Sequence, residues 1–327
     1  MAHAYCADQP GGVEVLEWRD LPTPAPGPGE VVIGQTKIGL NFIDVYMTSG
    51  IYPFPEEGPQ IPGSEAAGVV TALGEGVSGF AVGDRVAYTT PNGAYREERV
   101  MPAAKLVKLP DEVSDEVAAA AMLKGMTVEY LLNRSFRVTA EDAVLFHAAA
   151  GGVGLIAGQW LRHIGATSIG TVGSDEKLAE AKAAGYTHVI NYNTTDFTEA
   201  VAEITGGKGV SVAYDSVGQA TYPQTLKCLR KFGLFVSFGQ SSGVIKNFAT
   251  GDLAQNGSLY AQRPTLFSFI DTPESLAEVS GNLFSMLADG HVSLSINQRY
   301  ALKDVPAAFD ALINRRTTGA TVFDTGR

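Results

Sequence analysis

The spacing of apolar residues divides the chain into a first part of short strands and a second part in which strands and helices alternate. Before Ser114, apolar runs such as 31–33 and 67–70 are only a few residues long, and Gly and Pro stand between them. Short apolar runs separated by Gly and Pro are typical of β-strands joined by turns. Residues 82–87 likewise predict a turn that leads into a strand. We therefore expect the first part of the chain to be rich in β-structure.

From Ser114 onward, helical spacing appears. Ser114 is a suitable N-cap, and the helix formers after it predict a helix over 115–132. The predicted strands that follow are 143–146, 168–172, 189–192, 210–214 and 234–238, and the helices among them include 155–164, 176–184 and 198–204. A strand at 258–261, a helix near 273–288 and a helix–strand unit over 305–323 close the chain. Strands separated by helices predict right-handed crossovers and a doubly wound parallel sheet, an α/β fold.

The loop after the first of these strands has the composition of a phosphate-binding turn. It reads AAAGGVG from Ala148 to Gly154 and follows the apolar run 143–146. Small residues let the backbone approach a pyrophosphate, and a helix N-terminus offers N–H groups and partial positive charge. Aligned on G-x-G-x-x-G, the positions are Ala149, Gly151 and Gly154, so the motif alone also fits a tight turn without a ligand. The alternating strands and helices around it favour a dinucleotide site.

The end of the second strand of such a sheet decides between NAD and NADP, because an acidic side chain there binds the ribose 2′-hydroxyl and repels a 2′-phosphate. Here the strand ends in Gly173 and Ser174, without a carboxylate. With Ser174 as N-cap, the two acidic residues that follow fall in the first helical turn, where the helix dipole favours them. Lys177 then stands at the third helical position and can bend back toward the strand end. We predict NADP(H), although a solvated surface lysine is the alternative for Lys177.

Composition and charge narrow the possible functions. The chain has 327 residues, of which 45% are hydrophobic and 18% charged, as in ordinary globular proteins, and this length predicts two domains. No apolar run approaches the roughly 20 residues needed to cross a bilayer, and no secretory signal is visible. The net charge of −11 disfavours nucleic acid as the main partner. With only Cys6 and Cys228, we expect no disulfide framework and a location in the cytoplasm.

A set of short segments occurs in the order that is found in one enzyme family. The segments are NFID (41–44), GSEAAG (63–68), GDRV (83–86), LKGMT (123–127), HAAAGGVG (147–154) and DSVG (215–218). Together they closely resemble the NADPH:quinone oxidoreductase (zeta-crystallin-like) branch of the zinc-free medium-chain dehydrogenase/reductase superfamily. The resemblance implies a GroES-like catalytic domain over 1–124, completed by 264–327, and a Rossmann NADP(H)-binding domain over 125–263. It also implies a homodimer, for which 258–261 is a candidate edge strand.

The chain departs from the alcohol dehydrogenases of this superfamily at the catalytic metal. Those enzymes hold zinc with Cys, His and Cys, whereas the aligned positions here are Asn41, Ser64 and, less securely, Leu123. An amide, a hydroxyl and an alkyl side chain do not form a zinc site. The cysteine-rich segment for a structural zinc is missing as well, and the five histidines are scattered along the chain. We therefore expect no bound metal.

Without zinc as a Lewis acid, an unactivated alcohol is a poor substrate, whereas a quinone or a conjugated enone accepts hydride readily. The candidate catalytic residues are Asn41, Tyr46, Tyr52 and Thr127. The resemblance implies that Asn41 and Tyr46 border the nicotinamide and the carbonyl of the acceptor. Tyr46 can donate a hydrogen bond to a developing oxyanion. For Tyr52, packing with its hydroxyl at the surface explains the residue equally well, and no general acid is assigned.

The resemblance implies further contacts with the cofactor, residue by residue. They add to Asn41, Tyr46 and Thr127, to Gly151, Gly152 and Val153 of the glycine loop, and to Gly173, Ser174 and Lys177 at the predicted 2′-phosphate site. The set carried over from the family is Tyr192, Val217, Phe238, Gly239, Ser241 and Arg315. All but Arg315 lie at carboxyl ends of parallel strands, where a doubly wound sheet binds ligands. Arg315, from the C-terminal helix, is predicted to complete a phosphate clamp.

These observations lead to an NADPH-dependent, metal-free reductase of quinones or related electron-poor α,β-unsaturated carbonyls. The motifs do not separate it from a dedicated enone or enal reductase. The resemblance also allows an NADPH-binding protein with minor turnover, since relatives serve as lens crystallins or bind AU-rich RNA. A zinc-dependent alcohol dehydrogenase ranks last, because the ligand types for zinc are missing.

Overall fold

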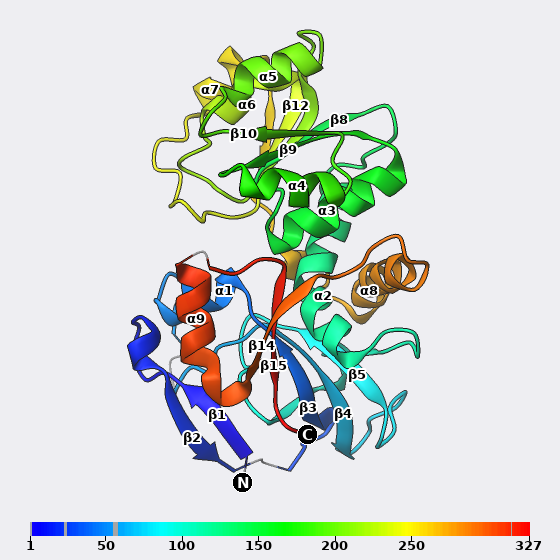
Figure 1. Cartoon of the computed structure of the whole chain (residues 1–327). Helices are drawn as coiled ribbons and strands as arrows, with labels where there is room; N and C mark the ends of the chain where they lie inside the picture. The colour runs from blue at the N-terminus through cyan, green and yellow to red at the C-terminus, as the bar shows by residue number, and fades with distance from the viewer. Residues whose placement is uncertain (1, 23–24, 55–57, 315) are drawn as a thin grey trace. The chain divides into compact units, whose positions relative to one another are not determined.

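The computed structural model describes residues 2–22, 25–54, 58–314 and 316–327. The chain divides into two compact units, whose helices and strands are labelled in Figure 1. Unit 1 comprises Met1–Met126, Phe269–Ala288 and Leu294–Arg327, and unit 2 comprises Thr127–Ser268 and Asp289–Ser293. The predicted α/β fold class is confirmed, since unit 1 is rich in β-structure and unit 2 is a doubly wound parallel sheet.

Unit 1 is built around a seven-stranded sheet. Its strands, in order of hydrogen-bonded neighbours, are β14 (Ile296–Ala301), β15 (Ala320–Asp324), β3 (Glu30–Gly39), β4 (Glu65–Leu73), β5 (Arg85–Thr89) and β7 (Val107–Lys108), with β6 (Glu98–Pro102) paired to β3 beside this path. β14 and β15 are parallel, whereas β15 pairs antiparallel with β3. β1 (Ala2–Cys6) and β2 (Glu17–Leu21) form a separate antiparallel pair.

The helices of unit 1 cover this sheet and bury its apolar side chains. They are α1 (Phe42–Thr48), α8 (Pro273–Ala288), α9 (Val305–Ile313) and the first part of α2 (Asp115–Tyr130), with short 3₁₀ turns at Val13–Val15, Ala103–Lys105 and Leu302–Asp304. Tyr95, Phe309 and Phe323 are buried together in the core, with the Tyr95 ring edge-on to both phenyl rings. α1 packs against α9, as Figure 1 shows. This packing fixes the helix that begins directly after Asn41.

Unit 2 is a six-stranded parallel sheet with helices on both faces. Its strand order is β10 (His188–Asn191), β9 (Thr167–Val172), β8 (Ala143–Phe146), β11 (Val210–Asp215), β12 (Leu229–Ser237) and β13 (Tyr260–Gln262). Helices α3 (Gly152–Ile164) and α4 (Glu176–Ala183) lie on one face, and α5 (Phe197–Ile204) and α6 (Gln224–Lys227) on the other (Figure 1). The chain also forms α7 (Thr250–Gln255), a π turn at Leu131–Ser135 and a 3₁₀ turn at Leu266–Ser268. The strand order reverses between β8 and β11, which makes this the switch point where such sheets bind ligands.

Most predicted elements of unit 2 appear within a few residues of their expected bounds. The helix expected at 155–164 begins earlier, at Gly152, because Gly151 acts as its N-cap. The helix expected at 115–132 gives way to a π turn after Tyr130. The strand expected at 258–261 is observed at Tyr260–Gln262, as the edge of the sheet. The differences lie at element ends, where capping rather than apolar spacing decides.

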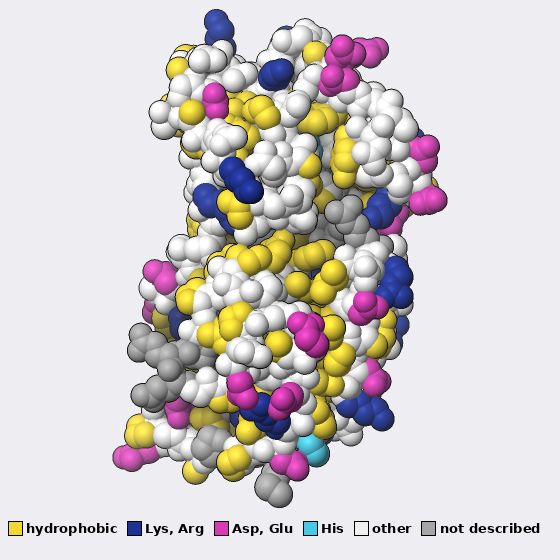
Figure 2. All heavy atoms as spheres, turned by 90° about the vertical axis from the view of Figure 1, so that its left-hand side faces the viewer, with side chains coloured by type: hydrophobic (Ala, Val, Ile, Leu, Met, Phe, Trp, Pro, Cys, Tyr) yellow, Lys and Arg dark blue, Asp and Glu magenta, His cyan; other side chains and the backbone are white. Residues whose placement is uncertain are grey.

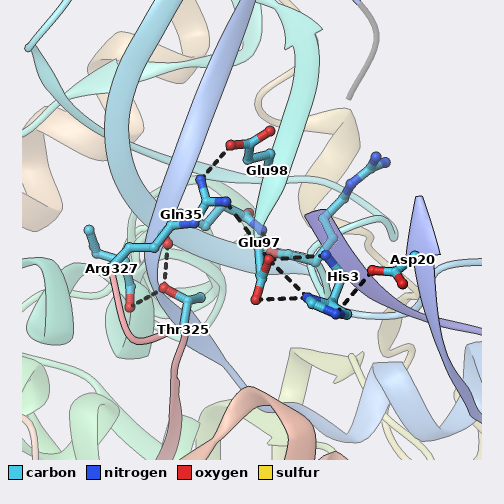
Figure 3. A network of polar contacts seen from close by, with 9 residues as sticks. His3, Asp20, Gln35, Glu97, Glu98, Thr325 and Arg327 are labelled. Atoms are coloured by element: carbon cyan, nitrogen blue, oxygen red, sulfur yellow. Dashed lines mark hydrogen bonds and ion pairs between the residues drawn. The ribbon is translucent and has the colours of Figure 1, made fainter. Parts of the chain in front are cut away.

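Within unit 1, a polar network joins the first strand and the last residues of the chain to Glu97 and Glu98 (Figure 3). The His3 imidazole lies between Asp20, at 3.0 Å from Nε2, and Glu97, at 3.3 Å from Nδ1. Arg327 donates to the Glu98 carboxylate at 2.6 Å. Because these side chains are partly exposed to water, each ion pair contributes little to stability.

The surface carries mixed charge. On the face drawn in Figure 2, Lys and Arg side chains occur singly or in small groups among Asp and Glu side chains. This face therefore lacks the continuous basic stripe that nucleic acid binding uses. Within the described parts of the chain, no helix combines the length and the apolar composition needed to cross a membrane.

Candidate active site

The loop between β8 and α3 has the geometry of a phosphate-binding turn. Ala148 adopts a left-handed conformation with φ of 56°, and the Gly151 N–H donates to its carbonyl oxygen at 2.9 Å. A Cβ on Gly154 would collide with the carbonyl oxygens of Ala148 and Ala149, so a side chain has no room there. Gly151 is the N-cap of α3, and no side chain caps this helix end. The N–H groups of the first turn, which includes Gly152 and Val153, therefore have no partner within the helix and can bind an anion.

The ends of β9 and β10 bring Gly173 and Tyr192 together. A Cβ on Gly173 would lie 2.7 Å from the Tyr192 hydroxyl oxygen, so a larger residue here would displace this phenol. The carboxylate that follows, Asp175, accepts a hydrogen bond from Asn191 Nδ2 at 2.7 Å. Asp175 is thereby held toward β10, and the tip of β9 itself carries no acidic side chain.

The start of α4 differs from the prediction that Ser174 is its N-cap. The Lys177 N–H donates to the Ser174 carbonyl, only three residues back, at 3.2 Å, so this first bond is a turn rather than an α-helical bond. α4 begins at Glu176, with Asp175 as N-cap, and Lys177 is its second residue. The Ser174 hydroxyl donates to Glu176 at 3.3 Å. Ser174 and Lys177 still lie in the turn directly after β9, as the prediction of a 2′-phosphate site requires.

Four further predicted residues meet beyond the ends of β11 and β12: Val217, Phe238, Gly239 and Ser241. The Phe238 N–H donates to the Asp215 carbonyl at 2.8 Å, and the Asp215 carboxylate accepts from the Val217 N–H at 2.7 Å. The Phe238 ring packs on Phe146, at the end of β8, with 5.6 Å between ring centroids. The bond between Phe238 and Asp215 joins the segments after β11 and β12. These segments and Gly173 lie on opposite sides of the switch point.

In unit 1, Asn41 belongs to a buried polar cluster. Its Nδ2 donates to Glu65 Oε1 at 2.8 Å, and the same oxygen accepts from Lys124 Nζ at 2.8 Å. Glu65 Oε2 accepts from the Leu123 N–H at 2.6 Å. Since a carboxylate only accepts hydrogen bonds, Glu65 fixes the Asn41 amide with its nitrogen inward.

Asp44 holds the start of α1. It is fully buried and accepts hydrogen bonds from the Asn41 N–H at 2.8 Å and from the hydroxyls of Ser64 and Tyr95, both at 2.6 Å. Burial raises the pKa of Asp44 to about 6, against the opposite effect of these hydrogen bonds. Asp44 thus braces the helix that carries Tyr46, which agrees with a capping role rather than that of a catalytic base.

The remaining candidate catalytic residues lie in different settings. Tyr46 is half-buried on α1, and its ring lies 6.2 Å from that of the exposed Phe42. Tyr52 is half-buried in the segment after α1. Thr127 is on α2 and belongs to unit 2, whereas the two tyrosines belong to unit 1. Arg315 lies outside the described residues.

The residues at the expected zinc positions do not fit a metal. Ser64 donates to Asp44 and Asn41 donates to Glu65, while Leu123 contributes its backbone N–H to Glu65. Across residues 2–22, 25–54, 58–314 and 316–327, no three His, Cys, Asp or Glu side chains form a group that could hold a metal ion. These positions therefore offer no ligand set for zinc.

Sequence reasoning missed Glu65, Lys124, Tyr95 and His147, all of which are buried polar residues. One signal was present: Glu65 directly precedes the apolar run 66–70 at the start of β4, and a carboxylate that is buried there needs a partner. The partner, Lys124, is 59 positions away, so the pair becomes visible only in the fold.

Comparison with known proteins agrees with this architecture. Residues 27–111 match the alcohol dehydrogenase GroES-like domain, and residues 152–279 match the domain described as zinc-binding dehydrogenase. The chain is 49% identical over 314 residues to a quinone oxidoreductase of Pseudomonas aeruginosa, with 96% of each chain covered. It is 43% identical over 330 residues to a 2-haloacrylate reductase of a Burkholderia species, with 99% of each covered.

A solved structure leads to the same family. The fold matches that of Escherichia coli quinone oxidoreductase complexed with NADPH with a TM-score of 0.95, at 44% identity, covering 99% of this chain and 100% of the other. By this similarity over its whole length, the chain belongs to the quinone oxidoreductase family of the medium-chain dehydrogenase/reductase superfamily.

Proposed function

We propose that this protein is an NADPH-dependent, zinc-independent reductase of quinones or related α,β-unsaturated carbonyls. The observation that carries the proposal is the glycine loop at the switch point between β8 and β11, with an uncapped helix end behind it. The family to which the chain belongs includes a relative whose structure is described as an NADPH complex. Both point to the same cofactor.

The residues of unit 2 fit NADPH. Gly152 and Val153 would bind the pyrophosphate through their N–H groups at the start of α3. Gly151, whose N–H donates to the Ala148 carbonyl, would let the backbone approach the phosphates because it has no side chain. Gly173, Ser174, Lys177 and Tyr192 would surround the 2′-phosphate. Of the two carboxylates that follow, Asp175 is turned to Asn191, whereas Glu176 accepts from the Ser174 hydroxyl and would have to release it for the phosphate. Arg315 remains our candidate for completing the phosphate clamp.

Further along the sheet, Val217, Phe238, Gly239 and Ser241 would line the path toward the nicotinamide. Their support is the hydrogen bonding that joins the loops after β11 and β12. NADPH supplies the hydride when it is bound.

The chain's own side chains would orient the acceptor. The Asn41 amide, held by Glu65, would border the nicotinamide and the acceptor. Tyr46 and Tyr52 would donate from their hydroxyls to a carbonyl oxygen that gains negative charge. Thr127 is the corresponding candidate in unit 2. We propose residues 1–124 with 264–327 as the catalytic domain and 125–263 as the cofactor domain, in the cytoplasm.

Steady-state turnover with NADPH tests the function. We expect a benzoquinone or naphthoquinone to be reduced with NADPH preferred over NADH, by protein purified without detectable zinc and unaffected by a chelator. Stoichiometric zinc that is needed for turnover would refute the metal-independent chemistry. Absence of NADPH binding would refute the function as a whole.

A second candidate substrate is an activated alkene. The observation that favours it is the 43% identity to a 2-haloacrylate reductase over 99% of both chains. Quinone, enone and 2-haloacrylate should be compared side by side with the same NADPH concentration. If kcat/KM for an alkene exceeds that for every quinone by tenfold or more, the dedicated alkene reductase is the better description.

We also propose a homodimer that pairs sheets through β13. This strand is the edge of the parallel sheet, and Tyr260 on it is 63% exposed. Phe232 is 66% exposed as well. It lies near the start of β13, because its N–H donates to the carbonyl of Gly257, three residues before Tyr260. Tyr260→Arg should shift the mass measured by light scattering from dimer to monomer. A wild-type monomer at micromolar concentration would refute this assembly.

A further inference from the structure

His147 is a buried titratable side chain for which the proposed reaction has no use. It stands between β8 and Ala148, the first residue of the phosphate-binding loop. Its side chain is fully buried, and the Phe197 ring meets it edge-on at 5.2 Å between centroids. A polar ring at this depth must have each of its nitrogens satisfied, because an unpaired buried polar atom is costly.

Both ring nitrogens have a threonine partner. Nδ1 lies 2.8 Å from Thr171 Oγ1, and Nε2 lies 2.9 Å from Thr225 Oγ1. The Thr225 hydroxyl proton is committed to the Thr221 carbonyl oxygen at 3.0 Å. Thr225 Oγ1 therefore accepts from His147, which puts the proton on Nε2 and leaves Nδ1 to accept from the Thr171 hydroxyl. The arrangement needs a neutral imidazole in one tautomer.

The backbone next to His147 is strained and is held on both sides. Ala148 has φ of 56°, a left-handed conformation that costs a residue with a Cβ roughly 1 kcal/mol or more. The His147 N–H donates to the Tyr214 carbonyl and the Ala149 N–H to the Thr171 carbonyl, each at 2.9 Å. Thr171 thus holds the loop twice, through its carbonyl and through its hydroxyl. Strained residues persist where the surroundings fix them in this way.

We propose that His147, as the neutral Nε2–H tautomer held between Thr171 and Thr225, is a positioning residue for the Ala148–Gly154 loop. Its two directed bonds reach β9 and α6, so the ring fixes the direction in which the chain leaves β8. The loop thereby keeps the shape that receives the pyrophosphate. The inference rests on the proposed NADPH function, and its test is a binding measurement rather than turnover.

The test compares dissociation constants for NADPH from titrations of nucleotide fluorescence, with the full-length chain throughout. Thr171→Val and Thr225→Val each remove one hydroxyl while they keep the side-chain shape. We expect each to raise Kd several-fold and His147→Leu to raise it about tenfold. Adding either threonine change to His147→Leu should have little further effect, because the bonds are already lost. His147→Gln, whose amide nitrogen can reach the Nε2 position, should restore part of the affinity.

The control for general destabilisation is Val201→Ala, a change in the apolar core of unit 2. It should lower the melting temperature as much as the threonine variants do and leave Kd unchanged. NADPH and NADH affinities should fall by the same factor in the His147 variants, since the pyrophosphate is common to both. Equal Kd in wild type and both threonine variants, or an equal rise in Val201→Ala, would overturn the inference. Wild-type protein that binds NADPH but reduces no quinone would refute only the proposed acceptor.

Discussion

At the scale of single residues, we propose that a few side chains set which nucleotide the chain accepts and how the reacting groups are held. For the end of β9, the proposal rests on a strand tip without a carboxylate and on one cation in the first turn of α4. Asp175 is turned toward Asn191, and Lys177 is the second residue of α4. We therefore predict that the nucleotide choice depends on Lys177.

Lys177→Glu should raise the KM for NADPH about tenfold or more and change that for NADH much less, because the new carboxylate repels only the 2′-phosphate. The measurement is a pair of saturation curves with one quinone. Lys182→Glu, an exposed site on the same helix, serves as the charge-matched control. A similar increase for both nucleotides would remove Lys177 from the 2′-phosphate site.

The buried pair of Glu65 and Lys124 is the second residue-scale determinant. Removing one partner leaves the other charge buried and unpaired, which costs about 3–5 kcal/mol. Lys124→Met should therefore lower the free energy of unfolding by about this amount, whereas Glu65→Leu with Lys124→Met should cost much less. Urea unfolding measures both.

We predict that the same pair also affects catalysis, through Asn41. In the Glu65→Leu, Lys124→Met background the Asn41 amide is no longer oriented, so kcat should fall although the fold is kept. Asn41→Ala should then cause little additional loss. If the doubly substituted protein retains wild-type kcat, Glu65 is not needed to position Asn41.

At the scale of elements, the packing of one strand end against the next shapes the nucleotide site. Gly173→Ala would place a Cβ at 2.7 Å from the Tyr192 hydroxyl oxygen and displace that ring. We expect the KM for NADPH to rise several-fold. Tyr192→Phe in the same chain removes the clashing oxygen and should recover part of the loss. Kinetics of the three variants test this, and an unchanged KM in Gly173→Ala would contradict it.

The elements themselves were largely predictable, and the reason is periodicity. β8 to β12 are apolar runs separated by helical spacing, so their order along the chain is enough to predict a parallel sheet. The ends of the elements were less predictable, because they depend on capping and turns rather than on apolar spacing. Ser174 has the chemistry of an N-cap, yet the chain makes a turn there and α4 takes Asp175 instead.

The polar interior was predictable only in part, because it depends on tertiary contacts. Neither the pairing of Glu65 with Lys124 nor the tautomer of His147 follows from local spacing, since their partners come from distant elements. The assignment of Asn41, Tyr46, Tyr52 and Thr127 to catalysis stays a prediction. Turnover of quinones by variants at these positions bears on it directly.

At the scale of the whole molecule, stability should respond to acid through the buried histidine. Burial lowers the pKa of His147, with the nearby Asp215 acting in the opposite direction. The unfolded chain therefore binds a proton at this histidine more readily than the folded chain does. The stability that the neutral ring contributes is present above about pH 6.5 and is lost as the pH falls below that value. His147→Gln removes this dependence. The difference between the unfolding free energies of wild type and variant should shrink on acidification from pH 8 to pH 5.

Asp44 acts in the opposite sense and must be separated from this effect. Its pKa is about 6 in the folded protein, above its ordinary value, so it disfavours folding as pH rises from about 4 to 6. Since both variants being compared contain Asp44, its contribution cancels in the difference. A difference that is independent of pH would show that His147 does not titrate on unfolding.

The threading of the chain through the two units has a consequence for synthesis on the ribosome. Unit 1 is assembled from three segments, and β15 pairs with β3 across almost the full length of the chain. Phe323, on β15, packs in the core of unit 1 against Tyr95. The sheet of unit 2 is complete once Gln262 has emerged, whereas unit 1 must wait for the last strand to be translated. The sheet of the nucleotide-binding unit can therefore form first, and the sheet of the unit that carries Asn41 is complete only after β15 has been translated.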